Sequence, residues 1–307
     1  MTKKSMLGNF LLILTALIWG SAFVAQSVGG ALGTFSFNGI RSFIGSAALL
    51  VVIVAMKIMK KETLKADRNL LLGGVLCGVV LFFASTLQQY GLNQGVSSGK
   101  AGFITTLYII FVPVVYFFMK KGVSPRIWIS VTLALVGLYL LCLGGEGDAE
   151  GNFIKVLMSS FRFGMGEAAI LLGAVVFSAH IIIIDYYAPK VDCVKMSAIQ
   201  FFVVGLMSLP FMIFMEKPTF AAISFQMTPL LYAGVMSCSV AYTLQMIGQK
   251  ITKPTVASLL LSLESVFAVM SGALILGERH SAVEYIGCFI VFAGVIIAQL
   301  PEKDKNK

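Results

Sequence analysis

Thr86-Leu87-Gln88 is followed by Ala101, Leu107 and Phe111, and the same pattern returns as Thr243-Leu244-Gln245, Ala257, Leu263 and Phe267. Both copies lie in almost continuous apolar sequence. The chain therefore contains an internal repeat, and its fold is expected to consist of two related halves.

The composition indicates an integral membrane protein. Hydrophobic residues make up 58% of the 307 residues and charged residues only 12%, whereas soluble domains carry about 25% charged residues. A helix that crosses a bilayer core needs about 20 apolar residues. The sequence predicts ten such helices, at roughly residues 7–28, 34–57, 69–90, 96–118, 126–144, 167–187, 194–215, 228–249, 255–276 and 283–299. The predicted fold class is thus an all-α integral membrane protein with ten transmembrane helices.

Each half holds five of these spans, and the odd number makes the second half enter the membrane from the opposite side. The expected organisation is a first five-helix repeat over 1–145, an extracytoplasmic connector over 146–166, a second repeat over 167–300 and a charged cytoplasmic tail over 301–307. Inverted-topology repeats are a common construction of carriers that alternate a central site between two faces. This organisation favours a transport function.

We interpret the formal net charge of +9 as a signal of membrane topology rather than of nucleic-acid binding. With a cytoplasmic N-terminus, most of the 23 basic residues fall on the cytoplasmic side: Lys3, Lys4, Lys57, Lys60, Lys61, Lys65, Arg68, Lys120, Lys121, Arg126, Lys190, Lys195, Lys250, Lys253, Lys303, Lys305 and Lys307. This asymmetry predicts that both termini are cytoplasmic. We expect a multi-pass protein of the plasma membrane, which in a bacterium is the inner membrane.

Other functional classes find little support in the sequence. The five cysteines lack metal-ligand spacing, so neither a metal site nor a cofactor is predicted. The sequence offers no pair of a nucleophile and a general base at a suggestive depth in the membrane, so an enzyme is not expected. The inverted halves also argue against a receptor or scaffold without flux, although that alternative stays open.

Several motifs identify a family resemblance. They are residues 257–267 (ASLLLSLESVF), Leu276-Gly277-Glu278, residues 19–23 (WGSAF), Arg41 and residues 98–105 (SGKAGFIT). Together they resemble EamA-type transporters of the drug/metabolite transporter superfamily, over about residues 7–299. The resemblance implies ten helices in two inverted repeats around a cavity lined by spans one, three, four, six, eight and nine. It also implies movement of small organic solutes, often the export of amino acids, without an ATP-binding domain. Many relatives have proline after the glutamate of span nine, where this chain has Ser265.

Glu264 is the strongest candidate for a functional residue. It lies about 13 Å into the roughly 30 Å membrane core, and Tyr108 occupies the matching position of the first repeat. A carboxyl group at this depth costs about 2.5 kcal/mol or more on insertion scales, so it usually faces a cavity or a partner. His180, about 20 Å from the outer end of span six, is the second candidate for proton coupling. The alternative for both residues is hydrogen bonding that only ties helices together.

The remaining candidates for the substrate cavity are aromatic and polar. Trp19, Tyr242 and Tyr108 offer flat walls to an aromatic or cationic solute. Gln88 and Gln245, which are equivalent in the two repeats, and Thr105 offer hydrogen bonds; helix packing is the alternative for all of these residues. Arg41 and Lys100 lie toward the outer face, where extension of the side chain to the lipid headgroups is the simpler interpretation.

The leading hypothesis is a secondary transporter that exports a small polar metabolite, such as an amino acid or a related compound, by alternating access. Its partners would be the substrate, the lipid bilayer and, if transport is coupled through Glu264 and His180, protons. Facilitated diffusion needs no titrating residue and is the alternative to coupling. An importer of a small solute such as a quaternary amine is the second transport hypothesis. Either a monomer or a dimer is compatible with the sequence.

Overall fold

The computed structural model describes residues 3–60, 67–120, 122–143, 164–276 and 282–300, and all regular elements within these ranges are helical. The first half contains α1 (Lys3–Gly29), η1 (Gly30–Leu32), α2 (Thr34–Lys60), α3 (Arg68–Asn93), α4 (Ser98–Thr106), α5 (Tyr108–Phe118) and α6 (Pro125–Leu143). The second half contains α8 (Met165–Tyr187), η3 (Ala188–Lys190), α9 (Cys193–Phe211), η4 (Met212–Glu216), α10 (Phe220–Phe225), α11 (Met227–Leu231), η5 (Tyr232–Ala241), α12 (Tyr242–Gln249), α13 (Pro254–Leu261), α14 (Leu263–Ser271), η6 (Gly272–Leu276) and α15 (Ala282–Gln299).

These elements confirm the predicted fold class. Within the described ranges, nine helical stretches are long and apolar enough to cross a bilayer, and the shorter apolar helix over 125–140 corresponds to the predicted fifth span. Span four consists of α4 followed by α5, and span nine consists of α13, α14 and η6. Most of the predicted connector and the whole predicted tail lie outside the described residues.

Short polar residues define where several helices begin. The carboxylate of Asp192 accepts hydrogen bonds from the backbone N–H groups of Val194 and Lys195, at 2.9 and 3.1 Å, and so caps α9. Ser97 caps α4 in the same way. These caps satisfy backbone donors that the first turn of a helix leaves unpaired. The apolar runs are therefore interrupted at defined residues, which fixes where each span starts.

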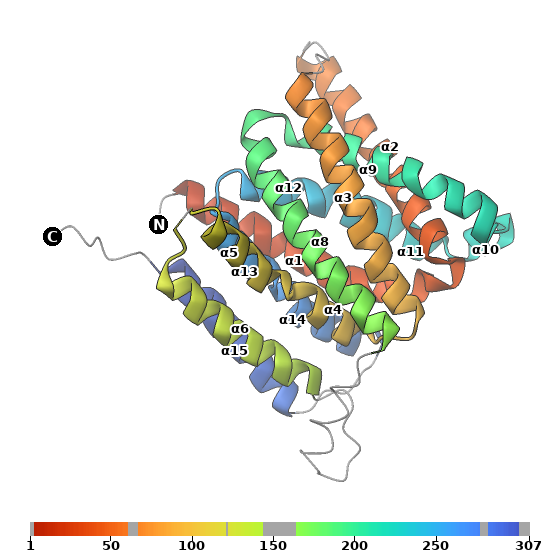
Figure 1. Ribbon diagram of the computed structural model, residues 1–307. Helices are drawn as coiled ribbons and strands as arrows, with labels where there is room; N and C mark the ends of the chain where they lie inside the picture. The colour runs from red at the N-terminus through yellow and green to blue at the C-terminus, as the bar shows by residue number, and fades with distance from the viewer. Residues whose placement is uncertain (1–2, 61–66, 121, 144–163, 277–281, 301–307) are drawn as a thin grey trace, which may run out of the picture.

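The helix contacts follow a two-fold pattern that relates the repeats. Spans two and seven, α2 and α9, pack on each other, and so do spans five and ten, α6 and α15. The contact of α3 with α8 has its counterpart in the contact of α12 and η5 with α1. Likewise, α4 and α5 pack on α8, while α13 and α14 pack on α1. Figure 1 shows α6 and α15 side by side at one edge of the bundle, away from α2 and α9.

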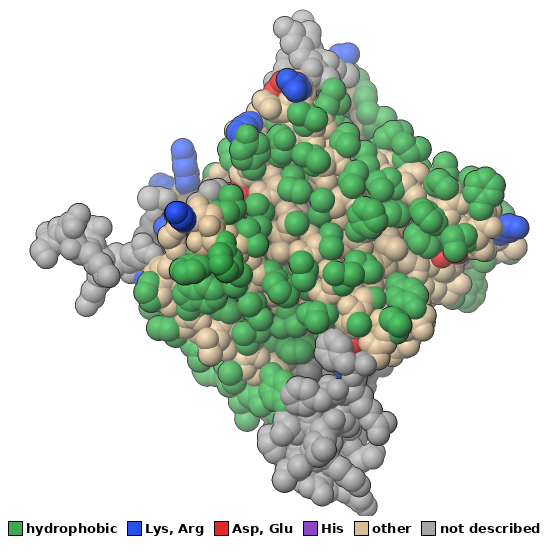
Figure 2. All heavy atoms as spheres, viewed as in Figure 1, with side chains coloured by type: hydrophobic (Ala, Val, Ile, Leu, Met, Phe, Trp, Pro, Cys, Tyr) green, Lys and Arg blue, Asp and Glu red, His purple; other side chains and the backbone are tan. Residues whose placement is uncertain are grey.

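The outer surface is suited to lipid. Large apolar side chains such as Phe118, Phe214 and Phe289 are at least 75% exposed. Figure 2 shows hydrophobic side chains spread over the visible face, with lysines and arginines at its margins. An exposed apolar surface of this extent is expected where a helix bundle contacts acyl chains rather than water.

Glycines allow the closest contacts between helices. A Cβ atom on Gly78 of α3 would lie 2.6 Å from Cβ of Val203 and 2.7 Å from the carbonyl oxygen of Gln200, both on α9. Small residues let transmembrane helices approach closely and gain dispersion contacts. The α3–α9 contact therefore depends on the absence of a side chain at this position.

Candidate functional site

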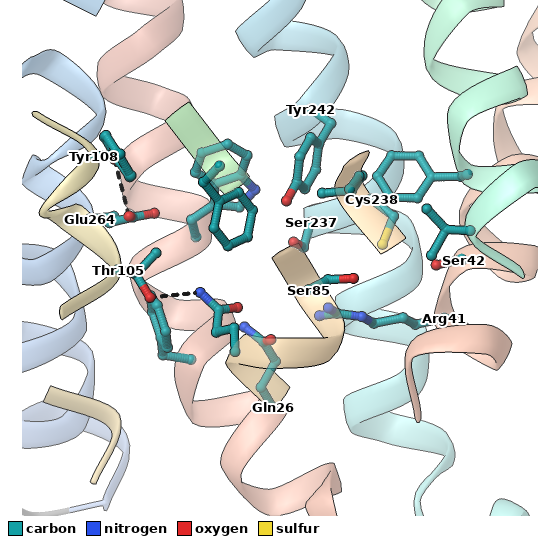
Figure 3. A pocket seen from close by; sticks show the side chains of 17 residues that line it. Gln26, Arg41, Ser42, Ser85, Thr105, Tyr108, Ser237, Cys238, Tyr242 and Glu264 are labelled. Carbon is teal, nitrogen blue, oxygen red and sulfur yellow. Dashed lines mark hydrogen bonds between the residues drawn. The ribbon is translucent and has the colours of Figure 1, made fainter. Parts of the chain in front are cut away.

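A central cavity lies between the two repeats, and Figure 3 shows the side chains around it. It contains about 530 Å³ of space that atoms do not fill, counted up to its open side. Its polar lining consists of Gln26, Arg41, Ser42, Ser85, Gln88, Thr105, Ser237 and Glu264. Its aromatic lining consists of Trp19, Phe23, Tyr108, Phe177, Phe201 and Tyr242. An apolar pocket with a few converging polar groups is typical of a binding site for a small organic molecule.

Two broken helices meet beside this cavity. Span four is interrupted at Leu107, between α4 and α5, and span nine is interrupted at Ser262, between α13 and α14. At both breaks the backbone tightens: the N–H of Leu107 donates to the carbonyl of Ile104, and the N–H of Ser265 donates to that of Ser262. Span nine is thus broken although the residue after the glutamate is serine rather than proline. Discontinuous helices near the midplane are characteristic of transporter binding sites.

The break in span nine gives Glu264 its position. Glu264 lies in the first turn of α14 and is only 3% exposed. The hydroxyl of Tyr108, the first residue of α5, donates a hydrogen bond of 3.1 Å to Oε1 of Glu264. The matching residues of the two repeats are therefore in direct contact, and this contact joins the broken helices.

The same junction has a second hydrogen bond. The hydroxyl of Ser265 on α14 donates to that of Thr106 on α4, at 3.2 Å, and both residues are fully buried. On the cavity side of α4, Thr105 accepts a hydrogen bond of 3.0 Å from Nε2 of Gln88 (dashed in Figure 3). These hydrogen bonds hold the polar groups of spans three, four and nine in one arrangement.

Aromatic rings form one wall of the cavity. The ring of Trp19 lies 4.6 Å from that of Tyr242, measured between centroids, and Phe201 packs edge-on against Tyr242 at 5.1 Å. In the described part of the chain, Nε1 of Trp19 has no hydrogen-bond partner. The wall therefore presents flat aromatic faces, which suit a solute with an apolar part.

Six of the eight predicted cavity residues line the cavity: Glu264, Tyr108, Trp19, Tyr242, Gln88 and Thr105. His180 and Gln245 do not. His180 is 1% exposed, hydrogen-bonds to Oε1 of Gln200 at 3.0 Å and lies behind the ring of Tyr242, 5.8 Å away. Gln245 is also 1% exposed. Both side chains are therefore buried outside the cavity lining, and His180 contacts the ring of one lining residue, Tyr242.

The structure adds lining residues that the sequence did not indicate. Arg41 lies in the cavity lining and is 7% exposed, so its side chain does not extend to the headgroups as expected. Span two therefore contributes to the cavity, and so does span seven, through Phe201 and Val204. Lys100 also departs from the expectation, since its ammonium group pairs with Glu167 at 3.0 Å, between α4 and α8.

Replacing Tyr108 by phenylalanine is expected to lower the free energy of unfolding by about 1–3 kcal/mol, because Glu264 then loses its donor in a buried setting. Thermal melting of the purified protein in detergent measures this change. Tyr90→Phe is the control, since Tyr90 is 38% exposed and lies outside the cavity. Equal melting temperatures for both variants would contradict the structural importance of the contact.

The described residues contain no cluster of histidine, cysteine, aspartate or glutamate that would hold a metal ion. The cavity instead presents one carboxyl group, one guanidinium group, amides, hydroxyls and aromatic rings. These groups are able to bind and orient an organic solute through hydrogen bonds, charge and stacking.

Comparisons with known proteins agree with this architecture. Residues 6–143 and 164–299 match the sequence profile of the EamA-like transporter family. An uncharacterized transporter of Archaeoglobus fulgidus is 29% identical over 299 residues, covering 97% of this chain and 87% of the relative. The uncharacterized transporter YetK of Bacillus subtilis is 24% identical, covering 95% and 86%.

Two further similarities are more distant. The S-adenosylmethionine/S-adenosylhomocysteine transporter of Chlamydia muridarum is 24% identical over 212 residues, covering 65% of this chain and 61% of that protein. One protein of known crystal structure superposes with a TM-score of 0.74 over 95% of this chain and 96% of its own, at 17% identity. That superposition supports the fold alone.

Proposed function

Because the chain belongs to the EamA-like transporter family, we propose that this transporter exports a small polar organic solute, such as an amino acid or a related metabolite. The observation that carries the proposal is the position of Glu264, a buried carboxyl group at a helix break on the wall of the central cavity. Ionisable residues inside a membrane are costly and usually serve function.

The chemistry of the cavity supports a solute of this kind. Aromatic faces and a few polar groups that converge on one cavity suit a small organic molecule. Trp19 and Tyr242 would contact its apolar part, while Gln88, Thr105 and Glu264 would orient its polar groups. The Chlamydia relative carries, by its name, compounds that contain an amino-acid moiety, and this agrees with the proposed substrate class.

Alternating access would come from rocking of one repeat against the other around the cavity. The two-fold pattern of helix contacts supports this motion, because each repeat packs on the other through corresponding helices. The breaks at Leu107 and Ser262 would serve as hinges, since few backbone hydrogen bonds need to change there. The contact between Tyr108 and Glu264 couples these hinges to the cavity.

Glu264 is also the proposed site of proton coupling. A carboxyl group that faces the cavity can take up a proton on one side of the membrane and release it on the other. His180 would act in this process only indirectly, through Tyr242. We further propose that the protein resides in the plasma membrane with both termini in the cytoplasm, as the distribution of lysine and arginine indicates.

Untargeted metabolite profiling of the medium tests the direction and class of transport. Cells that overproduce the intact protein are compared with cells that produce Glu264→Gln at the same level in the membrane. Compounds that accumulate outside only with the intact protein would support export and identify the substrate class.

Other outcomes of the profiling would count against export. Compounds that disappear from the medium would favour import, for which the aromatic wall suits a quaternary amine. An unchanged medium would contradict export and favour a receptor or scaffold without flux.

A further inference from the structure

Arg41 is a buried cation without a protein anion. Its side chain is 7% exposed and lines the central cavity. In the part of the chain that the structure describes, no carboxylate pairs with Arg41 and no hydrogen bond of its guanidinium is present. An arginine stays protonated in proteins, so it needs compensation when it is removed from water.

The surroundings of Arg41 supply only part of that compensation. The guanidinium carbon lies 5.3 Å from the centre of the Phe37 ring, which is a cation–π contact. Other cavity residues drawn near it in Figure 3 are Ser42, Ser85 and Cys238, all uncharged. The five N–H groups of a guanidinium form a fork that fits the two oxygens of a carboxylate. The missing partner of Arg41 is therefore expected to be an anion that enters the cavity.

The cavity holds a complementary group on its other side. Figure 3 shows the Arg41 guanidinium directed into the cavity from one side and Glu264 on the opposite side. Tyr108 donates to Oε1 of Glu264, and no other described residue donates a hydrogen bond to the second oxygen of this carboxyl group. Gln26, also in the lining, has an Oε1 atom without a hydrogen-bond partner among the described residues. Arg41, which has unpaired donors, and Glu264, which has an oxygen without a donor among the described residues, thus line the same cavity.

We infer that Arg41 binds the carboxylate of the solute while the side of the cavity with Glu264 receives its amino group. The substrates are therefore solutes that carry both groups, with an apolar part against Trp19 and Tyr242. This inference rests on the proposed transport function and assigns a specificity-determining residue within the same cavity. Loss of the carboxylate from the solute, or of the guanidinium from the protein, should remove the same interaction.

Counterflow into proteoliposomes tests the inference with three sets of labelled compounds. They are the proteinogenic amino acids, the amides of these amino acids, and the corresponding carboxylic acids that lack the amino group. The intact full-length protein should exchange amino acids and should discriminate against both other sets. Arg41→Gln should reduce amino-acid exchange by about 10- to 150-fold, the usual effect of one charge-assisted hydrogen-bonded contact. The preference for amino acids over their amides should shrink by the same factor, whereas Arg41→Lys, which keeps the charge, should retain part of the amino-acid exchange.

Ser46→Ala serves as the control for disturbance of α2, because Ser46 lies on the same helix outside the cavity lining, where its hydroxyl donates to the carbonyl of Ala198. Equal loss of amino acids and amides in Arg41→Gln would overturn the inference, since a carboxylate contact affects only one of them. Exchange of the carboxylic acids as fast as the amino acids would overturn the role of the amino group. Flux of compounds found by metabolite profiling, without exchange of the amino acids, would overturn this substrate class while leaving the proposed transport function standing. Absence of all flux would contradict both.

Discussion

Glu264→Gln is expected to abolish solute accumulation driven by a pH gradient while exchange of solute across the membrane partly survives. Glutamine has almost the same shape as glutamate and still accepts the hydrogen bond that Tyr108 donates, so the broken helices stay joined. It cannot bind and release a proton in the physiological range. Coupling and exchange are therefore separated by this one substitution.

The measurement uses proteoliposomes with an imposed pH gradient and a labelled solute from the profiling experiment. In the intact protein the solute should accumulate above its external concentration, whereas in the variant it should only equilibrate. Glu284→Gln is the matched control, because Glu284 is also 3% exposed but lies on α15, outside the cavity lining. Driven accumulation that is unchanged in Glu264→Gln would exclude coupling through this residue and favour facilitated diffusion.

The transmembrane spans were predictable because a helix that crosses a bilayer needs about 20 apolar residues, and such runs are visible in the sequence itself. The predicted span 126–144 differs from α6 by one residue at both ends, and the predicted span 283–299 differs from α15 by one residue at its start. The break in span nine was not predictable, since the usual cause, a proline, is absent. In the structure, the backbone N–H of Ser265 donates to the carbonyl of Ser262, which tightens the turn that contains Glu264.

The position of a residue along its helix was also easier to predict than the direction in which its side chain points. His180 has the expected position along α8, yet it faces Gln200 of α9 rather than the cavity. Arg41 lies in the N-terminal part of α2, which the sequence predicts to be near the outer face, where a long side chain usually reaches the headgroups. Its orientation toward the cavity follows from how α2 packs on α9 and η5. A single sequence contains no direct signal for such packing.

Gly20→Ala is expected to destabilise the protein, although alanine normally favours a helix by about 1 kcal/mol over glycine. A Cβ atom at Gly20 would lie 2.5 Å from Cβ of Phe267 and 2.7 Å from the backbone nitrogen of Ala268. These atoms belong to α14, so the contact is relieved only if α1 and α14 separate. We expect a loss of about 1–3 kcal/mol, the usual effect of overpacking.

Gly102→Ala separates this effect from the general consequences of replacing a glycine. Gly102 faces the same pair of helices, but its added Cβ would lie 3.7 Å from Phe23 and 3.8 Å from Ser265, at ordinary contact distance. Its melting temperature should therefore stay the same or rise, while that of Gly20→Ala falls. Because α14 carries Glu264, the Gly20 variant should also lose pH-driven accumulation at temperatures where it is still folded. A melting temperature of Gly20→Ala equal to that of the intact protein would show that α1 and α14 have room to separate, and the close contact would then not hold Glu264 in position.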